Sequence, residues 1–531
     1  MKSKRLSSDL SSDPQAAEAQ RLVRAASRLS LVACFDRQVR LHGSRIAIES
    51  DGLEWTYAGL DRRAGRMAAR LVREGVGRGD RIAMLSENDP DFLVLAIAAL
   101  RLGAAVATLN PRLARAELEH CIALVGPRVL LQSSRMQQAV GSFETLVDRV
   151  VTIGAGSPLR SDLDADDESS AADIAAPTGD AEDIQFIIYT SGTTGLPKAA
   201  MISQRAMLAR LMVYVIDYRV DGDDTFLAWS PLCHMASIEL GFGTLLRGGK
   251  VVVLDGADLP TICDHLEREP ISNLIFFPGM VEQAIDYLRR RKPAVRGLKK
   301  FGALADLFNP DDIAELTRLL GVPYTNTFGS TETGMAPASA GELAIGVPPL
   351  DLAKAQSALC EVRICREDGS EAATGEIGEL AMRGPTLFSG YWAAPAATLE
   401  AFHDGWYRSG DMFRRRADGL LEYVDRRKYL IKSGGENIYP AEIERVLMRH
   451  PQVADAVAIR RRDARWGEVP VVVAVAHGTR PDDEELLALC REHLAPFKRP
   501  RQVIWVEPDE LPRNHTGKVI RAELERWLEA R

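Results

Sequence analysis

Helical and strand-like segments alternate over residues 55–131, and this alternation limits the possible folds more than any other feature of the sequence. Residues 61–74 have the apolar spacing of a helix, 81–85 of a short strand, 89–102 of a helix and 104–109 of a second strand. Such alternation favours parallel strands covered by helices. The chain is therefore predicted to be an α/β protein with parallel sheets.

The length of 531 residues is too large for a single hydrophobic core. After about residue 425 the pattern changes to a helix over 440–449, a strand over 469–476 and a helix over 481–494, which is typical of a small α+β unit. We therefore predict a disordered polar leader over 1–25, a large N-terminal domain over 26–425 and a smaller, mobile C-terminal domain over 426–531.

Charge and hydropathy argue against several classes of protein. The net charge of −8 gives no basic footprint for nucleic acid. The apolar run over 92–100 stops at Arg101 and is too short for a membrane span. The polar leader lacks the apolar core of a signal peptide. These features predict a cytoplasmic protein that binds no nucleic acid and has no membrane span.

A stretch rich in hydroxyls and glycines follows the apolar strand over 186–188. Glycines let the backbone approach an anion, hydroxyls donate hydrogen bonds to it, and a lysine adds positive charge. A phosphate group is the predicted ligand. The residues concerned are Thr190, Ser191, Gly192, Thr193, Thr194, Gly195 and Lys198.

A P-loop NTPase is the rival interpretation of this stretch. That motif requires a lysine directly after its last glycine and a hydroxyl residue directly after the lysine. Here Leu196 and Pro197 separate Gly195 from Lys198, and Ala199 follows the lysine. The spacing excludes a P-loop.

The same stretch resembles the signature of the adenylate-forming enzymes, which include the acyl-CoA synthetases. The resemblance extends from about Trp55 to Lys518 and includes four further motifs in the family's order. These motifs are residues 327–333, 407–411, 427–444 and 511–518. The family fold implies a large domain that binds ATP and the acid, with the small domain rotating against it.

The resemblance assigns the nucleotide site residue by residue. Glu332 would bind Mg²⁺, whose hard character suits a carboxylate, and Lys518 would stabilise the negative charge that grows as the carboxylate of the acid attacks the α-phosphate. An ordinary turn is the alternative for the motifs of Glu332 and Asp411. The other assigned residues are Phe328 and Gly329 beside adenine, Thr331 at the α-phosphate, and Asp411 with Arg426 at the ribose.

The fourth motif opens the small domain. Lys428 lies at the hinge position of the family, and Tyr429 departs from the acidic residue that often follows it. The resemblance places CoA against a set of residues at the start and middle of the small domain, although a solvated loop explains its two arginines equally well. That set is Lys432, Ser433, Gly434, Gly435, Trp466, Phe497, Arg499 and Arg501.

His234 matches a histidine that lines the acyl site and joins Thr190, Glu332 and Lys518 as a catalytic candidate, with a buried core histidine as the alternative. Met235, Phe277 and Met335 are expected near the same pocket. The family usually has a small Gly-Gly-Ala stretch beside adenine and the acyl group. Residues 302–307 read Gly-Ala-Leu-Ala-Asp-Leu instead, and this bulkier acidic stretch is expected to reshape the pocket.

The sequence thus predicts an ATP-dependent acid–thiol ligase that forms acyl-AMP, releases pyrophosphate and transfers the acyl group to CoA. Its substrates would be a carboxylic acid, ATP with Mg²⁺, and CoA, and it would be a monomer or homodimer. An apolar or aromatic acid is favoured because such pockets are generally apolar. An acyl-AMP ligase that loads a carrier protein and a non-catalytic nucleotide-binding protein remain alternatives.

Overall fold

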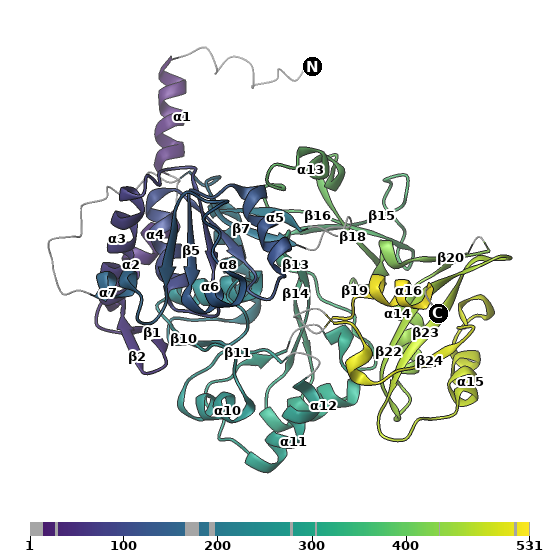
Figure 1. The fold of residues 1–531 in the computed structure, drawn as a ribbon. Helices are drawn as coiled ribbons and strands as arrows, with labels where there is room; N and C mark the ends of the chain where they lie inside the picture. The colour runs from purple at the N-terminus through teal and green to yellow at the C-terminus, as the bar shows by residue number, and fades with distance from the viewer. Residues whose placement is uncertain are drawn as a thin grey trace. The chain divides into compact units, whose positions relative to one another are not determined.

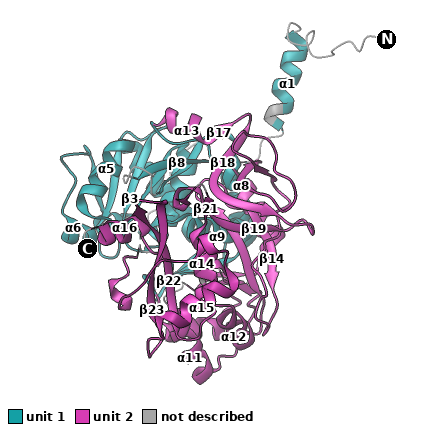
Figure 2. Ribbon diagram, turned by 90° about the vertical axis from the view of Figure 1, so that its right-hand side faces the viewer, with its two compact units in different colours: residues 1–208, 228–256, 388–393 teal, residues 209–227, 257–387, 394–531 magenta. Residues whose placement is uncertain are grey.

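The computed structural model describes residues 14–26, 30–164, 180–190, 197–276, 280–302, 305–434, 436–513 and 518–529. The chain forms two compact units, coloured separately in Figure 2. Unit 1 comprises residues 1–208, 228–256 and 388–393, and unit 2 comprises 209–227, 257–387 and 394–531. The predicted domain boundary between 425 and 426 stays a prediction.

Unit 1 is built on a six-stranded sheet (Figure 1). All neighbouring strands are parallel except the last pair, which is antiparallel. The predicted α/β class with a parallel sheet is confirmed. In spatial order the strands are β6 (Val150–Ile153), β5 (Val129–Ser133), β3 (Arg81–Leu85), β4 (Ala105–Leu109), β7 (Ile184–Thr190) and β8 (Lys198–Ser203).

Helices bury the faces of this sheet. Leu118 and Ile122 of α5 (Arg115–Val125) share one apolar core with Leu85, Leu130 and Ile187 of the strands. A second, small sheet contains β2 (Leu53–Thr56), β1 (Ile46–Ser50) and β10 (Lys250–Val253). The other helices that lie wholly in this unit are α1 (Pro14–Ala26), α2 (Leu31–His42), α3 (Tyr57–Arg73), α4 (Asp91–Leu102), α6 (Ser134–Val140), α7 (Pro158–Asp164) and α9 (Met235–Arg247).

Two of the sheets of unit 2 carry Phe328, Asp411 and Arg426, which are assigned to the nucleotide. One has β11 (Asn273–Leu274), β12 (Lys300–Phe301), β13 (Tyr324–Ser330) and β14 (Gly334–Leu343) in that order. The other has β15 (Glu361–Cys365), β16 (Ile377–Arg383), β18 (Trp406–Arg415) and β17 (Phe402–His403), with β19 (Leu421–Arg426) paired to β18. Its helices before residue 426 are α10 (Leu259–Arg268), α11 (Val281–Arg291), α12 (Pro310–Leu320) and α13 (Pro395–Ala401).

The C-terminal part of unit 2 has its own hydrophobic core. Ile443 of α14 (Pro440–Leu447) and Leu486 of α15 (Asp483–His493) pack with Val472 of the central strand. Leu524 of α16 (Arg521–Glu529) belongs to a second cluster of buried residues, which also contains Val473. The sheet contains β20 (Ile431–Ser433), β21 (Glu436–Ile438), β22 (Val453–Asp463), β23 (Gly467–Ala476) and β24 (Val503–Trp505).

One local feature differs from the prediction. The leader predicted to be disordered contains a helix, α1 (Pro14–Ala26), which is rich in strong helix formers such as alanine. Helix α8 (Gln204–Val213) is followed directly by a π-helical turn, η2 (Tyr214–Tyr218). Among the described residues, no helix combines the length and apolarity needed to cross a membrane.

Candidate active site

The Thr331–Glu332 motif forms a tight turn between β13 and β14. Ser330 pairs with Gly334 across the two strands, and the Ser330 N–H donates to Thr333 Oγ1 at 3.0 Å. A Cβ on Gly329 would collide with the carbonyl oxygen of Gly334, so this position requires glycine. The turn therefore presents Thr331 and Glu332 at its tip.

Phe328, which precedes this turn on β13, belongs to a cluster of three aromatic rings. The Phe328 ring is stacked on Tyr423 at 5.6 Å between centroids and meets Phe413 edge to face at 4.9 Å. Burial is the main cause that raises the pKa of Tyr423 far above its usual range. The cluster thus keeps Phe328, the residue assigned to adenine, in a fixed orientation.

Asp411 and Arg426 are direct neighbours across β18 and β19. Arg426 Nε donates to Asp411 Oδ1 at 2.9 Å, and only 1% of Asp411 is exposed. Burial raises the pKa of the Asp411 carboxyl; the charge of Glu332 adds to this rise, while Arg426 and Lys518 oppose it. Arg426, Lys518 and Glu332 therefore all act on the charge of Asp411 within unit 2.

Lys518 follows residues 514–517, which lie outside the described residues. Burial lowers the pKa of its ammonium group, Arg426 adds to that effect, and Asp411 and Asp306 oppose it. Removal of a cation from water favours its neutral form, whereas a nearby carboxylate favours the charged form. The structure thus brings Lys518 to the pair that the resemblance assigns to the ribose.

The atypical stretch over 302–307 is tied to the rest of unit 2 by its acidic residue. Asp306 Oδ2 lies 2.8 Å from Nζ of Lys354, a lysine with no exposed surface. The same Nζ donates to Asn326 Oδ1 on β13 at 2.8 Å. Asp306, whose side chain is partly exposed, is therefore bound to a polar network around a buried lysine. Ala303 and Leu304 lie outside the described residues.

In unit 1, the base of the predicted phosphate loop is a pair of antiparallel strands. Thr190, the last residue of β7, pairs with Lys198, the first residue of β8. Nζ of Lys198 lies 5.2 Å from the centroid of the Tyr391 ring. The loop residues Ser191, Gly192, Thr193, Thr194 and Gly195 lie outside the described residues.

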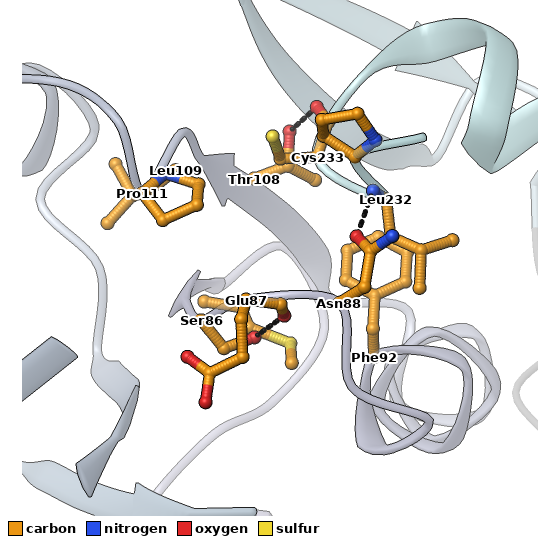
Figure 3. Close-up of a pocket in the computed structure, with 11 residues that line it drawn as sticks. Ser86, Glu87, Asn88, Phe92, Thr108, Leu109, Pro111, Leu232 and Cys233 are labelled. Carbon is orange, nitrogen blue, oxygen red and sulfur yellow. Dashed lines mark hydrogen bonds between the residues drawn. The ribbon is translucent and has the colours of Figure 1, made fainter. Parts of the chain in front are cut away.

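His234 immediately precedes α9, and the segment leading to it is fixed at the carboxyl edge of the large sheet (Figure 3). Asn88 Oδ1 accepts from the Leu232 N–H at 2.7 Å, and Thr108 Oγ1 donates to the Cys233 carbonyl at 3.0 Å. Ligands of open α/β sheets commonly bind at this edge. The hollow here is lined by Met84, Ser86, Glu87, Asn88, Phe92, Thr108, Leu109, Pro111, Pro231, Leu232 and Cys233.

The residues assigned to the acyl pocket do not all fall within one described part. Met235 is the first residue of α9 in unit 1, Met335 lies on β14 in unit 2, and Phe277 lies outside the described residues.

Burial raises the pKa of the Cys233 thiol, next to His234, to about 12. Cys233 is therefore unsuited to act as a nucleophile.

The predicted hinge residue lies in a single turn of 3-10 helix, η5 (Arg427–Tyr429), directly after β19. Arg460 Nη2 donates to the Lys428 carbonyl at 3.0 Å. The guanidinium of Arg521 lies 5.0 Å from the centroid of the Tyr429 ring. The aromatic residue at 429 is thus packed against a cation of the C-terminal helix α16.

The Gly434 turn and Trp466 are in close contact. The Gly434 N–H donates to the Trp466 carbonyl at 2.8 Å, and a Cβ on Gly434 would lie 2.7 Å from the indole ring. Gly434 also has φ of +58°, which favours glycine. The steric contact with Trp466 and the backbone conformation therefore each require glycine at this position. Trp466 is 38% exposed, and the guanidinium of Arg465 lies 4.7 Å from the centroid of its ring.

The remaining residues assigned to CoA are placed as follows. Lys432 and Ser433 lie on β20, and the Lys432 N–H donates to Glu468. Phe497 is half-exposed in the short helix η6 (Pro496–Lys498). Arg499 donates to the carbonyls of Leu494 and Arg491, and Arg501 is exposed. Gly435 lies outside the described residues.

Comparison with known protein families identifies both parts of the chain. A family model described as AMP-binding enzyme matches residues 35–392. The chain belongs to the AMP-binding enzyme family. A second model, described as AMP-binding enzyme C-terminal domain, matches residues 442–518. The predicted resemblance is confirmed.

Relatives of this AMP-binding enzyme are similar over nearly their whole length. A feruloyl-CoA synthase from Amycolatopsis sp is 33% identical, over 92% of this chain and 97% of the relative. An indoleacetate–CoA ligase from Aromatoleum aromaticum is 32% identical, over 95% and 99%. The crystal structure of ATP-bound MatB from Rhodopseudomonas palustris has a TM-score of 0.81 and 28% identity, over 94% and 99%.

Several residues of this AMP-binding enzyme that fix the segments carrying candidate site residues were not predicted from the sequence. Asn88 and Thr108 follow or end parallel strands, so their position at the carboxyl edge was a usable signal. Lys354 carried no such signal, because a lone lysine is usually solvated. Its pairing with Asp306, the acidic residue of the atypical stretch over 302–307, becomes visible only in the folded chain.

Proposed function

We propose that this AMP-forming acid–CoA ligase acts on an aromatic carboxylic acid. The observation that carries the chemistry is the hydrogen bond between Arg426 and the buried Asp411, together with the charges of Lys518 and Glu332 that act on the same carboxylate. The aromatic class is supported by two of the most similar relatives, which are named for feruloyl and indoleacetate groups. A long-chain fatty acid is the second candidate, since a relative at 29% identity is named for that substrate.

In the first half-reaction, a carboxylate oxygen of the acid attacks the α-phosphorus of ATP, and pyrophosphate leaves. Lys518 would stabilise the negative charge that accumulates on the transferring group, while Asp411 and Arg426 hold the ribose. The carboxylate of Glu332, whose charge also acts on Asp411, is a hard oxygen ligand that would suit Mg²⁺. The ion would neutralise charge on the phosphates.

In the second half-reaction, the CoA thiol attacks the acyl carbon, and AMP leaves. Rotation at Lys428 would withdraw Lys518 and bring the Gly434 turn to the acyl-AMP. The exposed ring of Trp466 and the exposed Arg501 would then receive the nucleotide end of CoA. The same site would thereby serve two reactions in turn.

A panel of aromatic and long-chain carboxylic acids, each assayed with and without CoA, tests the proposal. Release of AMP should be fastest with hydroxycinnamic or arylacetic acids, slow with long-chain fatty acids, and dependent on free CoA. Exchange of labelled pyrophosphate into ATP should require the acid but not CoA. Acid-dependent exchange without any response to CoA would favour a carrier protein as acceptor, and absence of exchange with every acid would reject the enzyme assignment.

Lys428→Pro tests the hinge. Proline fixes φ near −65°, which fits the first turn of a short helix but resists rotation. We expect a normal burst of pyrophosphate, little acyl-CoA and near-normal thermal stability. Lys428→Ala, which leaves the backbone free, is the matched control and should make acyl-CoA at the wild-type rate. Wild-type acyl-CoA formation by the proline variant would show that 428 is not the pivot.

A further inference from the structure

Arg210 is the largest side chain in the fully buried part of the described core. It lies on α8, it is 1% exposed, and none of the sequence motifs includes it. A buried guanidinium is costly unless its donors are satisfied. The groups that satisfy it therefore indicate what it does.

Two backbone carbonyls accept from this guanidinium. Nε donates to the Thr386 carbonyl at 2.9 Å, and Nη2 donates to the Thr331 carbonyl at 3.0 Å. Thr331 precedes Glu332 in the turn between β13 and β14. Arg210 thus contacts the backbone of the turn that carries the proposed metal ligand.

The stem of Arg210 also packs against the end of the same turn. A Cβ built on Gly334 would lie 2.9 Å from both Cγ and Nε of Arg210. Gly334 has φ of +71°, which favours glycine independently. The turn and the arginine are therefore fitted closely at two points, Thr331 and Gly334.

We propose that Arg210 is a positioning residue that fixes the Thr331–Glu332 peptide for binding of Mg²⁺ and ATP. The C=O and N–H of a trans peptide point in opposite directions. The bond to the Thr331 carbonyl therefore sets the direction of the Glu332 N–H and of the backbone from which the Glu332 side chain starts. This inference rests on the proposed role of Glu332.

Removal of the guanidinium tests the inference. Arg210→Met should slow acid-dependent pyrophosphate exchange by roughly 10- to 100-fold, the loss expected when a charged donor leaves a buried acceptor. Half-saturation should require more Mg²⁺, as in Glu332→Gln. Thioester formation from supplied acyl-AMP and CoA, with Mg²⁺ removed by chelator, should be slowed much less, because this half-reaction does not use the proposed metal ligand.

A binding measurement gives a readout that does not depend on turnover. In isothermal titration calorimetry without acid, Mg²⁺ should improve ATP affinity in the wild type, and Arg210→Met should reduce that improvement by roughly tenfold. Arg210→Lys retains a cation and one donor, so it should restore part of both effects. Arg205→Met is the control: Arg205 lies on the same helix but pairs with the exposed Glu182 at 2.6 Å.

The outcomes separate this inference from the proposed function. Wild-type Mg²⁺ dependence in Arg210→Met, or an equal loss of both half-reactions, would overturn the positioning role. If Arg210→Met does not fold, Arg210→Lys decides: a selective loss in exchange supports the role, and wild-type behaviour rejects it. A wild-type protein that shows no acid-dependent exchange would instead defeat the proposed function.

Discussion

Lys518→Ala should slow adenylation by roughly 10²- to 10³-fold, the loss expected when a preorganised charge-stabilising donor is removed. The structure places the ammonium group where Asp411 and Arg426 act on its charge. In solution a lysine has no such fixed orientation toward the reacting phosphate. Acid-dependent pyrophosphate exchange measures this half-reaction directly.

The second half-reaction provides the internal control for this variant. Thioester formation from supplied acyl-AMP and CoA should proceed at the wild-type rate, because Lys518 would have left the site by that stage. Lys518→Arg retains the charge with a different shape and should recover part of the exchange rate. An equal loss of exchange and thioester formation in Lys518→Ala would contradict the assigned role.

Asp306→Asn should lower the free energy of unfolding by about 3 kcal/mol, because it removes the anion that faces a fully buried lysine. Lys354 keeps its bond to Asn326, but its charge loses the Asp306 carboxylate at 2.8 Å. Urea denaturation without substrates measures the change, and the dependence of the free energy on urea should stay the same.

Two further variants sharpen this test. Asp311→Asn makes the same substitution at an exposed position in the first turn of α12, and it should cost about 0.5 kcal/mol or less. The double variant Asp306→Asn/Lys354→Met removes both charges and should recover much of the loss, since a buried pair can be replaced by apolar atoms at little cost. An Asp306→Asn variant as stable as Asp311→Asn would show that the pair contributes little.

The local pattern of the sequence predicted the large sheet well. Strand β3 has the bounds predicted from its apolar run, and the buried helix expected up to Leu102 is α4. Helix α3 begins four residues before the predicted 61, because Thr56 caps it by accepting from the Gly59 N–H at 3.1 Å. Because the capping residue directly precedes the helix in the sequence, this helix start could have been predicted from Thr56.

The position of Asp411 was harder to predict. Its motif has the appearance of a glycine turn, yet Gly410, with φ of +74°, lies inside strand β18, so Asp411 is a strand residue paired with Arg426. Arg210 and Lys354 could not be recognised as buried, because long cationic side chains are usually solvated. Their partners lie far away in the sequence, and only the folded chain brings them together.

The β18–β19 hairpin also has a consequence for the order in which the site is made. Asp411 and Arg426 are 15 residues apart and belong to adjacent strands, so their pairing requires little chain to be closed into a loop. Proteins are synthesised from the N-terminus, and domains fold as they emerge. A growing chain on the ribosome therefore has its ribose-binding pair long before Lys518 is added. A nascent or truncated chain that ends before Lys518 would be expected to hold a nucleotide without activating an acid.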